Sequence, residues 1–432
     1  MSTARFILIA LFCASPFILL WDGLLAQGIS AAILAVVLAI TAQGLRPGET
    51  EFLLSIIRPA AVLAAIPAIW IVFQILPLRP LAHPVWASAE TALGQQITGT
   101  ISIDPGASLL SLGQYLSLAA AALVSAAVAV DRARAESLLF ALTAASAVMA
   151  LIALLQEFLA PGLHLSSFAR AQAETCVVMG IVIAAAACIR TIERYETRHT
   201  NPQRSAPVLL RTLVACAAGF VVCAIALLVD GSRAVLIAAG SGLAVLAAIE
   251  IIRRFGLALW GTTAVAVTVA AAATLMIAAE PTVHGRSPLL ALAISSPAAQ
   301  SAVTQRVLDD APLVGTGAGT LAAIAPVYRE MDDPPLDVLS STAAATLAIE
   351  LGRPMLGLIA IAALAAIIFF MRASLQRGRD SFYPAMGAAC VVALLLLAFV
   401  EVGLFGNAAG LIAAGVLGLA LAQSKSRTAQ PL

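Results

Sequence analysis

Long apolar stretches separated by short polar segments run along almost the whole chain. A helix that crosses the roughly 30 Å hydrocarbon core of a bilayer needs about 20 residues, and most of these stretches reach or approach that length. They lie at about 6–21, 24–43, 54–76, 108–130, 137–159, 175–192, 208–229, 234–252, 257–279, 341–370, 383–403 and 408–423. The pattern predicts an all-α, polytopic integral membrane protein with about 12 transmembrane helices, forming a single membrane domain over residues 1–432.

Two segments between the apolar stretches are longer than the others, at about 77–107 and 280–340. Within the second, residues 297–311 and 320–331 have mildly helical patterns on either side of a glycine-rich turn that ends at Gly319. We expect short helices lying on the membrane surface and a tight turn with close backbone approach between them.

Composition supports the membrane assignment and excludes other classes. Hydrophobic residues make up 61% of the chain, charged residues 11%, and the mean hydropathy is +1.01. A soluble domain with so little charge would expose large apolar patches to water. The net charge of +1 provides no basic surface for nucleic acid. The six cysteines and four histidines have no disulfide-framework or metal-ligand spacing, so we expect no metal.

The basic residues are distributed unevenly between the segments that join the predicted helices. With the N-terminus in the cytoplasm, most of the 24 basic residues fall on the cytoplasmic side, as the positive-inside rule requires. This places both termini in the cytoplasm and both long segments outside. The external arginines are Arg79, Arg170, Arg233, Arg286, Arg306 and Arg329.

Arg233 and Arg170 each stand close to the predicted start of an apolar helix. Arg233 follows a short turn that begins at Asp230, and Arg170 lies in a polar segment before the next apolar stretch. Free backbone N–H groups at a helix start attract anions, and the planar guanidinium matches phosphate oxygens. Both arginines are therefore candidate phosphate ligands. The alternatives for Arg233 are a snorkelling side chain or an ion pair with Asp230.

Two further arginines have acidic neighbours. Arg306 precedes Asp309 and Asp310, so an ion pair and a ligand contact are both open. Arg353 falls inside an apolar stretch, where a charge is costly by roughly 3 kcal/mol or more. Glu350 lies on the same face of the predicted helix, which Pro354 should kink. We expect an internal Glu350–Arg353 ion pair that lines a cavity or is purely structural.

Three sequence elements resemble those of the O-antigen ligase / Wzy-type polymerase superfamily. Residues 227–234 (LLVDGSRA) resemble its Ser-Arg-Gly element at the external end of a spanning helix. Residues 310–320 (DAPLVGTGAGT) resemble the element D-x-P-L-x-G-x-G-x-G of its large external loop. Residues 349–352 (IELG) are similar to the E-x-G that opens the following helix. The order and placement of the three elements match the family as well.

The resemblance implies a metal-independent glycosyltransferase, a ligase or polymerase, in the bacterial inner membrane. Its donor would be a glycan linked to undecaprenyl diphosphate, and its role would be the biosynthesis of surface polysaccharide or exopolysaccharide. No cofactor is implied. Arg233, Arg170 and Arg306 would hold the diphosphate. The expected partners are the lipid-linked glycan, membrane lipid and other proteins of polysaccharide assembly.

The chain departs from the family pattern at the position of the presumed base. Ser341 stands where the family has a histidine, and Thr342 stands in the place of the asparagine that follows it. Glu350, Asp337 and His284 are the candidate replacements. Without a base, activation of the acceptor would lose roughly 10²–10⁴-fold in rate. Two alternatives therefore stay open, a non-catalytic component of polysaccharide assembly or export and a secondary transporter. A transporter would show two similar halves with broken helices, and none are visible.

Overall fold

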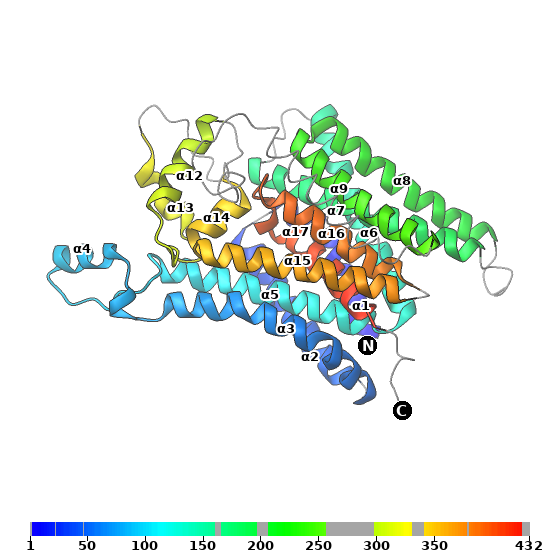
Figure 1. Ribbon diagram of the computed structural model, residues 1–432, viewed down its shortest axis with the longest axis horizontal. Coiled ribbons are helices and arrows are strands. Elements are labelled where there is room, and N and C mark those ends of the chain that lie inside the picture. Colours follow the sequence, from blue (N-terminus) through cyan, green and yellow to red (C-terminus); the bar gives the residue numbers. More distant parts are fainter. Residues whose placement is uncertain are drawn as a thin grey trace.

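The structure is a computed structural model that describes residues 2–21, 23–45, 47–159, 166–196, 206–255, 298–330, 341–377 and 380–425. All regular elements within these ranges are helices, as Figure 1 shows. Nine of these helices are long and apolar enough to span a membrane. They are α1 (Ser2–Leu20), α2 (Leu24–Gly44), α3 (Pro47–Ile75), α5 (Pro105–Ala129), α6 (Arg132–Leu159), α7 (Ser167–Glu196), α8 (Ala206–Asp230), α9 (Arg233–Phe255) and α15 (Arg353–Gln376). The chain is therefore a helical, polytopic membrane protein.

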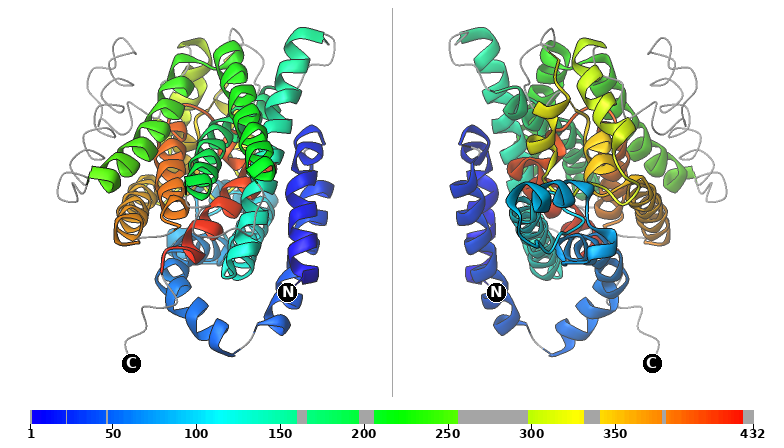
Figure 2. Two further views of the ribbon diagram at one scale, coloured as in Figure 1. Left: turned by 90° about the vertical axis from the view of Figure 1, so that its right-hand side faces the viewer. Right: turned by 90° about the vertical axis from the view of Figure 1, so that its left-hand side faces the viewer.

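Two shorter apolar helices complete the bundle, α16 (Phe382–Leu397) and α17 (Asn407–Ala422). Helix α7 is the most buried of the nine long helices. In its apolar 18-residue stretch 78% of the residues are buried, whereas in that of α3 only 11% are. Helices α7, α16 and α17 thus lie inside, and α2 and α3 lie at the margin (Figure 2).

Small residues allow the inner helices to pack closely. A side chain at Gly418 of α17 would place its Cβ 2.3 Å from the carbonyl oxygen of Ala122 on α5. A side chain at Gly387 of α16 would come within 2.4 Å of Ala420 on α17. Close backbone approach through small residues is the usual way in which membrane helices associate, because lipid provides little hydrophobic drive between them.

One predicted span begins too early in the chain, and another lies outside the described residues. The stretch 341–370 is two helices, α14 (Ala343–Glu350) and α15, with a break at Leu351 and Gly352. Gly352 has φ +94°, which other residues rarely adopt, and Pro354 occupies the first turn of α15, where it needs no hydrogen-bond donor. The predicted span 257–279 falls outside the described part of the chain.

Short helices gather at one end of the bundle, at the left of Figure 1. They are η1 (Arg79–Leu81), α4 (Pro84–Leu93), α12 (Ala298–Asp310), α13 (Leu321–Ile324) and η3 (Ala325–Tyr328), and α14 lies beside them. The short helices expected near 297–311 and 320–331 are confirmed; their position on a membrane surface stays a prediction. We call this the loop end of the bundle. The beginning of α1 and the end of α17 lie at the opposite end.

The glycine-rich turn before α13 packs closely against other segments at the loop end. Gly315, Gly317 and Gly319 all have positive φ, at +82°, +111° and +76°. A Cβ at Gly315 would lie 2.2 Å from the carbonyl oxygen of Glu350, and one at Gly317 would lie 2.3 Å from Oγ of Ser102. The expected tight turn with close backbone approach is therefore confirmed. We call residues 315–319 the glycine turn.

Side chains of α3 fasten the break between α14 and α15 to the bundle. Trp70 Nε1 donates to the carbonyl oxygen of Leu351 at 2.9 Å. The buried side chain of Gln74 donates to the carbonyl oxygens of Glu350 at 2.9 Å and Val314 at 3.0 Å. These donors satisfy carbonyl groups that the end of α14 leaves without helical partners.

We expect Gly352→Ala to lower the free energy of unfolding by at least about 2 kcal/mol, because it combines a strained φ with a steric clash. A Cβ there would lie 2.2 Å from the carbonyl oxygen of Leu313. Denaturation of the purified protein in detergent micelles measures the effect. Gly357→Ala is the matched control on α15, since a Cβ at that position meets no atom within 4 Å. Equal stability of the two variants would contradict the prediction.

Candidate functional site

The starts of α7 and α9 and the end of α8 lie close together, and each carries a charged side chain. Helix α7 begins with Ser166 Oγ accepting from the backbone N–H of Ala169 at 3.2 Å, and Arg170 follows in its first turn. Helix α9 begins in the same way, with Ser232 Oγ accepting from the backbone N–H of Val235 at 3.3 Å. Serine at the helix start is a favoured cap, and each cap leaves other N–H groups of that turn free.

The side chain of Arg170 connects α7 to the end of α8. Its Nη1 lies 3.8 Å from Oδ1 of Asp230, with side-chain exposures of 52% and 22%. An ion pair this exposed contributes on the order of 0–1 kcal/mol, so Arg170 is little constrained by it. A side chain at Gly231 would come within 2.4 Å of the carbonyl oxygen of Leu227, so the turn into α9 depends on glycine there.

Arg233 is the first residue of α9, three positions after Asp230, and it is exposed. Within the described ranges its guanidinium has no ion pair or hydrogen bond, so the ion pair with Asp230 that was one alternative is formed by Arg170 instead. Two arginines that the sequence predicts to be external are thereby carried by adjoining helix starts, with Asp230 between them. This arrangement leaves positive charge available to an anionic ligand.

Two carboxyl groups complete the cluster, and neither was among the site residues expected from the sequence. Glu174 lies one turn after Arg170 on α7, within electrostatic range of Arg170, Asp230 and Glu401. Its Oε2 is buried and accepts no hydrogen bond from any residue that the structure describes. Burial raises the pKa of Glu401, which lies between α16 and α17. The only sequence signal for Glu174 is its spacing of four residues from Arg170.

Ser341, where the resemblance places a histidine, lies two residues before the contact of α14 with Glu401. The backbone N–H of Ala343 donates to the carbonyl oxygen of Glu401 at 3.0 Å. Ser341 itself is 5% exposed, and its Oγ lies 2.9 Å from Oγ1 of Thr346. The start of α14 is therefore joined to the segment that carries Glu401. We call Arg170, Glu174, Asp230, Arg233 and Glu401 the helix-end cluster.

Glu350, a candidate base from the sequence, holds the glycine turn. Its Oε2 accepts from the backbone N–H of Gly319 at 2.8 Å, and its Oε1 accepts from that of Leu321 at 3.2 Å. Burial raises its pKa to about 7, and these two hydrogen bonds oppose the rise. Both oxygens are engaged in anchoring α13 to α14. A role as base stays a prediction.

The raised pKa of Glu350 makes stability depend on pH. Its folded-state pKa of about 7 exceeds the ordinary value of 4.5, so the folded state holds the proton more tightly. The stability that this carboxyl group contributes to the folded state is present below about pH 4.5 and is lost as pH rises through about 7. The loss amounts to about 3 kcal/mol. We expect Glu350→Gln to flatten this dependence in denaturation curves recorded between pH 4.5 and 8. Glu330→Gln, at a carboxyl group that is 72% exposed, is the control and should change nothing.

The expected Glu350–Arg353 ion pair is wrong. The two residues belong to different helices, because the chain breaks between α14 and α15. Arg353 Nη2 instead donates to the carbonyl oxygen of Leu308 near the end of α12, at 2.8 Å. The expected kink at Pro354 is replaced by a new helix start. Since the ion pair is not formed, it cannot line a cavity as one of the two expectations had it.

Arg306 lies on α12, away from the helix-end cluster. Its Nη1 donates to the carbonyl oxygen of Tyr328 and lies 3.5 Å from Oε1 of Glu330. It therefore forms an ion pair with Glu330. The structure brings Arg170 and Arg233 to adjoining helix starts and does not show Arg306 joining them. Asp337, His284 and Arg286 lie outside the described residues.

Chemically, the helix-end cluster can bind an anion through Arg170 and Arg233 and can accept a proton at Glu401. The described residues contain no group of three or more histidine, cysteine or acidic side chains placed to hold a metal ion. Comparison with known proteins finds no family model that matches the chain, and no curated protein matches it either. The site must therefore be interpreted from its own residues.

Proposed function

We propose that the chain handles a polyprenyl-diphosphate-linked glycan at the loop end, as a metal-independent glycosyltransferase of polysaccharide biosynthesis in the bacterial inner membrane. The observation that carries the proposal is the pairing of Arg170 with Asp230, which sets Arg170 and Arg233 on adjoining helix starts. Guanidinium groups and free helix N–H groups together form the kind of site that binds a diphosphate.

The transfer assigns a role to each charged group of the cluster. The oxygen of an acceptor hydroxyl attacks the anomeric carbon of the donor glycan, and the bond from that carbon to the diphosphate oxygen breaks. Arg170 and Arg233 stabilise the departing polyprenyl diphosphate. Glu401 takes the proton of the acceptor hydroxyl, because its raised pKa suits a general base better than that of an ordinary carboxylate.

A second function is favoured by one residue. Ser341 occupies the place where the resemblance expects a histidine base, and its hydroxyl is buried against Thr346. A protein that binds the lipid-linked glycan without transferring it would retain the arginines and dispense with the base. Such a protein would act in polysaccharide assembly or export together with other membrane components.

Turnover by the purified protein separates the two functions. Wild-type protein in lipid nanodiscs is incubated with a polyprenyl-diphosphate-linked oligosaccharide and an acceptor glycan, and released polyprenyl diphosphate is measured. We expect release together with a lengthened acceptor. Binding of the donor without release would favour the non-catalytic function, and absence of binding would contradict both.

A further inference from the structure

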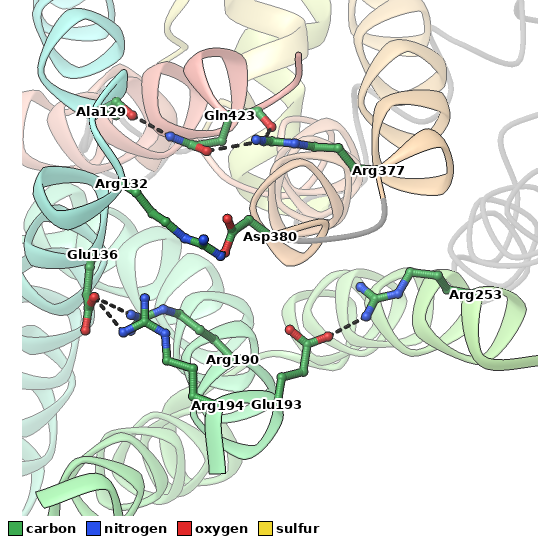
Figure 3. A network of polar contacts seen from close by, with 10 residues as sticks. All are labelled: Ala129, Arg132, Glu136, Arg190, Glu193, Arg194, Arg253, Arg377, Asp380 and Gln423. Atoms are coloured by element: carbon green, nitrogen blue, oxygen red, sulfur yellow. Dashed lines mark hydrogen bonds and ion pairs between the residues drawn. The ribbon is translucent and has the colours of Figure 1, made fainter. Parts of the chain in front are cut away.

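The end of the bundle opposite the loop end holds a second cluster of charged residues. Arg132 and Glu136 lie one turn apart on α6, and Arg190 and Arg194 lie one turn apart on α7. Figure 3 shows both arginines of α7 directed toward Glu136, while Arg132 extends toward Asp380, just before α16. The proposed transfer uses none of these residues.

Two arginines of this cluster contact one carboxylate. Arg190 Nη2 and Arg194 Nη1 lie 2.6 Å and 2.8 Å from the same oxygen, Oε2 of Glu136. Arg190 is only 2% exposed, and its guanidinium lies 5.2 Å from the ring centre of Phe140. One carboxylate thus serves two arginines. Among the described residues, the buried guanidinium of Arg190 has only this shared carboxylate as an ion-pair partner. Burial of an incompletely balanced charge is unfavourable, and an anion would relieve it.

Buried hydrogen-bonding groups without a partner occur on residues of this cluster and beside it. Tyr383 is 1% exposed, and its hydroxyl interacts electrostatically with Arg190 and Asp380. Among the described residues, that hydroxyl has no hydrogen-bond partner, nor have the buried Oγ of Ser381 and the Nε atoms of Arg132 and Arg190. Buried polar groups are almost always hydrogen-bonded, so four such atoms around one cluster point to a ligand.

A further arginine of this region, Arg377, forms a hydrogen bond with a neutral group. Arg377 donates to the carbonyl oxygen of Gln423, whose Nε2 in turn donates to the carbonyl oxygen of Ala129 at 2.6 Å (Figure 3). Arg377 is within electrostatic range of Arg132 and Asp380. It therefore adds a positive charge to the cluster without adding a carboxylate.

We propose that this cluster binds a phosphate group, with Arg132 and Arg194 at its rim and Arg190 and Tyr383 beneath them. The rim side chains are 38% and 27% exposed, so a ligand can reach them. Guanidinium forks match phosphate oxygens, and a tyrosine hydroxyl adds a neutral donor. The cluster lies where spanning helices end, at the level of lipid headgroups, so the phosphate can come from an anionic phospholipid or from solution.

Binding experiments on the purified full-length protein test the site. Inorganic phosphate is titrated against thermal stability in detergent, and retention of phosphatidylglycerol over phosphatidylcholine is measured by native mass spectrometry. We expect Tyr383→Phe to weaken binding about tenfold, the effect of losing a hydrogen bond to a charged group. Tyr195→Phe, which removes a more exposed hydroxyl near the end of α7, is the matched control and should bind normally.

A second variant keeps the test decisive if Tyr383→Phe fails to fold. Arg132→Gln alters the exposed rim, and Arg254→Gln, at an arginine that is 58% exposed near the end of α9, is its control. Retention of phosphatidylglycerol without an effect of free phosphate supports the site with a lipid as its source. An effect of both supports recognition of the phosphate group itself. Overturning results are binding of neither ligand, or equal binding by Arg132→Gln and Arg254→Gln.

Discussion

Replacing Arg233 with alanine lowers glycan transfer by roughly 10²–10³-fold, if Arg233 stabilises the leaving diphosphate as proposed. The guanidinium stands at the start of α9 and has no partner among the described residues, so its removal disturbs no contact described there. Stability should therefore change little while transfer is lost. Surface polysaccharide in cells that express the variant, together with release of polyprenyl diphosphate by the purified variant, measures the effect.

Arg79→Ala is the matched control for this variant. Arg79 is an exposed arginine of η1, also at the loop end, but it lies outside the helix-end cluster. We expect normal transfer from it and an intermediate loss from Arg170→Ala, because Arg170 shares its charge with Asp230. Normal polysaccharide in cells that contain only Arg233→Ala would contradict the proposed function, provided that the variant inserts in the membrane at wild-type levels.

Glu401→Gln lowers the turnover number by roughly 10²–10⁴-fold, the usual contribution of a general base. Glutamine keeps the size of the side chain but cannot accept the proton. Because burial raises the pKa of Glu401, wild-type activity should increase with pH through a limb above the ordinary carboxyl range. That limb should be absent in the variant. Initial rates at saturating donor between pH 4 and 8 measure both effects.

Glu157→Gln provides the comparison for Glu401→Gln. Glu157 is an exposed carboxylate near the end of α6 and does not belong to the helix-end cluster. The substitution should leave both the rate and the pH profile unchanged. A Glu401→Gln variant with a wild-type pH limb would show that another group takes the proton, even if its rate were reduced for structural reasons.

The helices that cross the bundle could be predicted because each is determined by its own apolar length. The break at Gly352 could not, since Leu351 continues the apolar stretch and a single glycine does not end a helix. The break depends on partners from distant parts of the chain, Trp70 and Gln74 on α3. Periodicity within a segment contains no information about such partners.

The candidate site was predictable to a similar degree. Arg170 and Arg233 could be singled out because they oppose the charge bias of the chain at predicted helix starts. Glu174 and Glu401 could not be joined to them, because they lie on α7 and after α16 and meet only in the folded bundle. Glu350 was singled out as a candidate base and as the partner of Arg353, whereas its carboxylate binds the backbone of the glycine turn.

The most direct test of the central claim is an experimental structure of the protein with a bound polyprenyl-diphosphate-linked oligosaccharide. We predict that the diphosphate lies between the guanidinium groups of Arg170 and Arg233, with the anomeric carbon toward Glu401. A diphosphate bound elsewhere on the protein, out of reach of both arginines, would contradict the account.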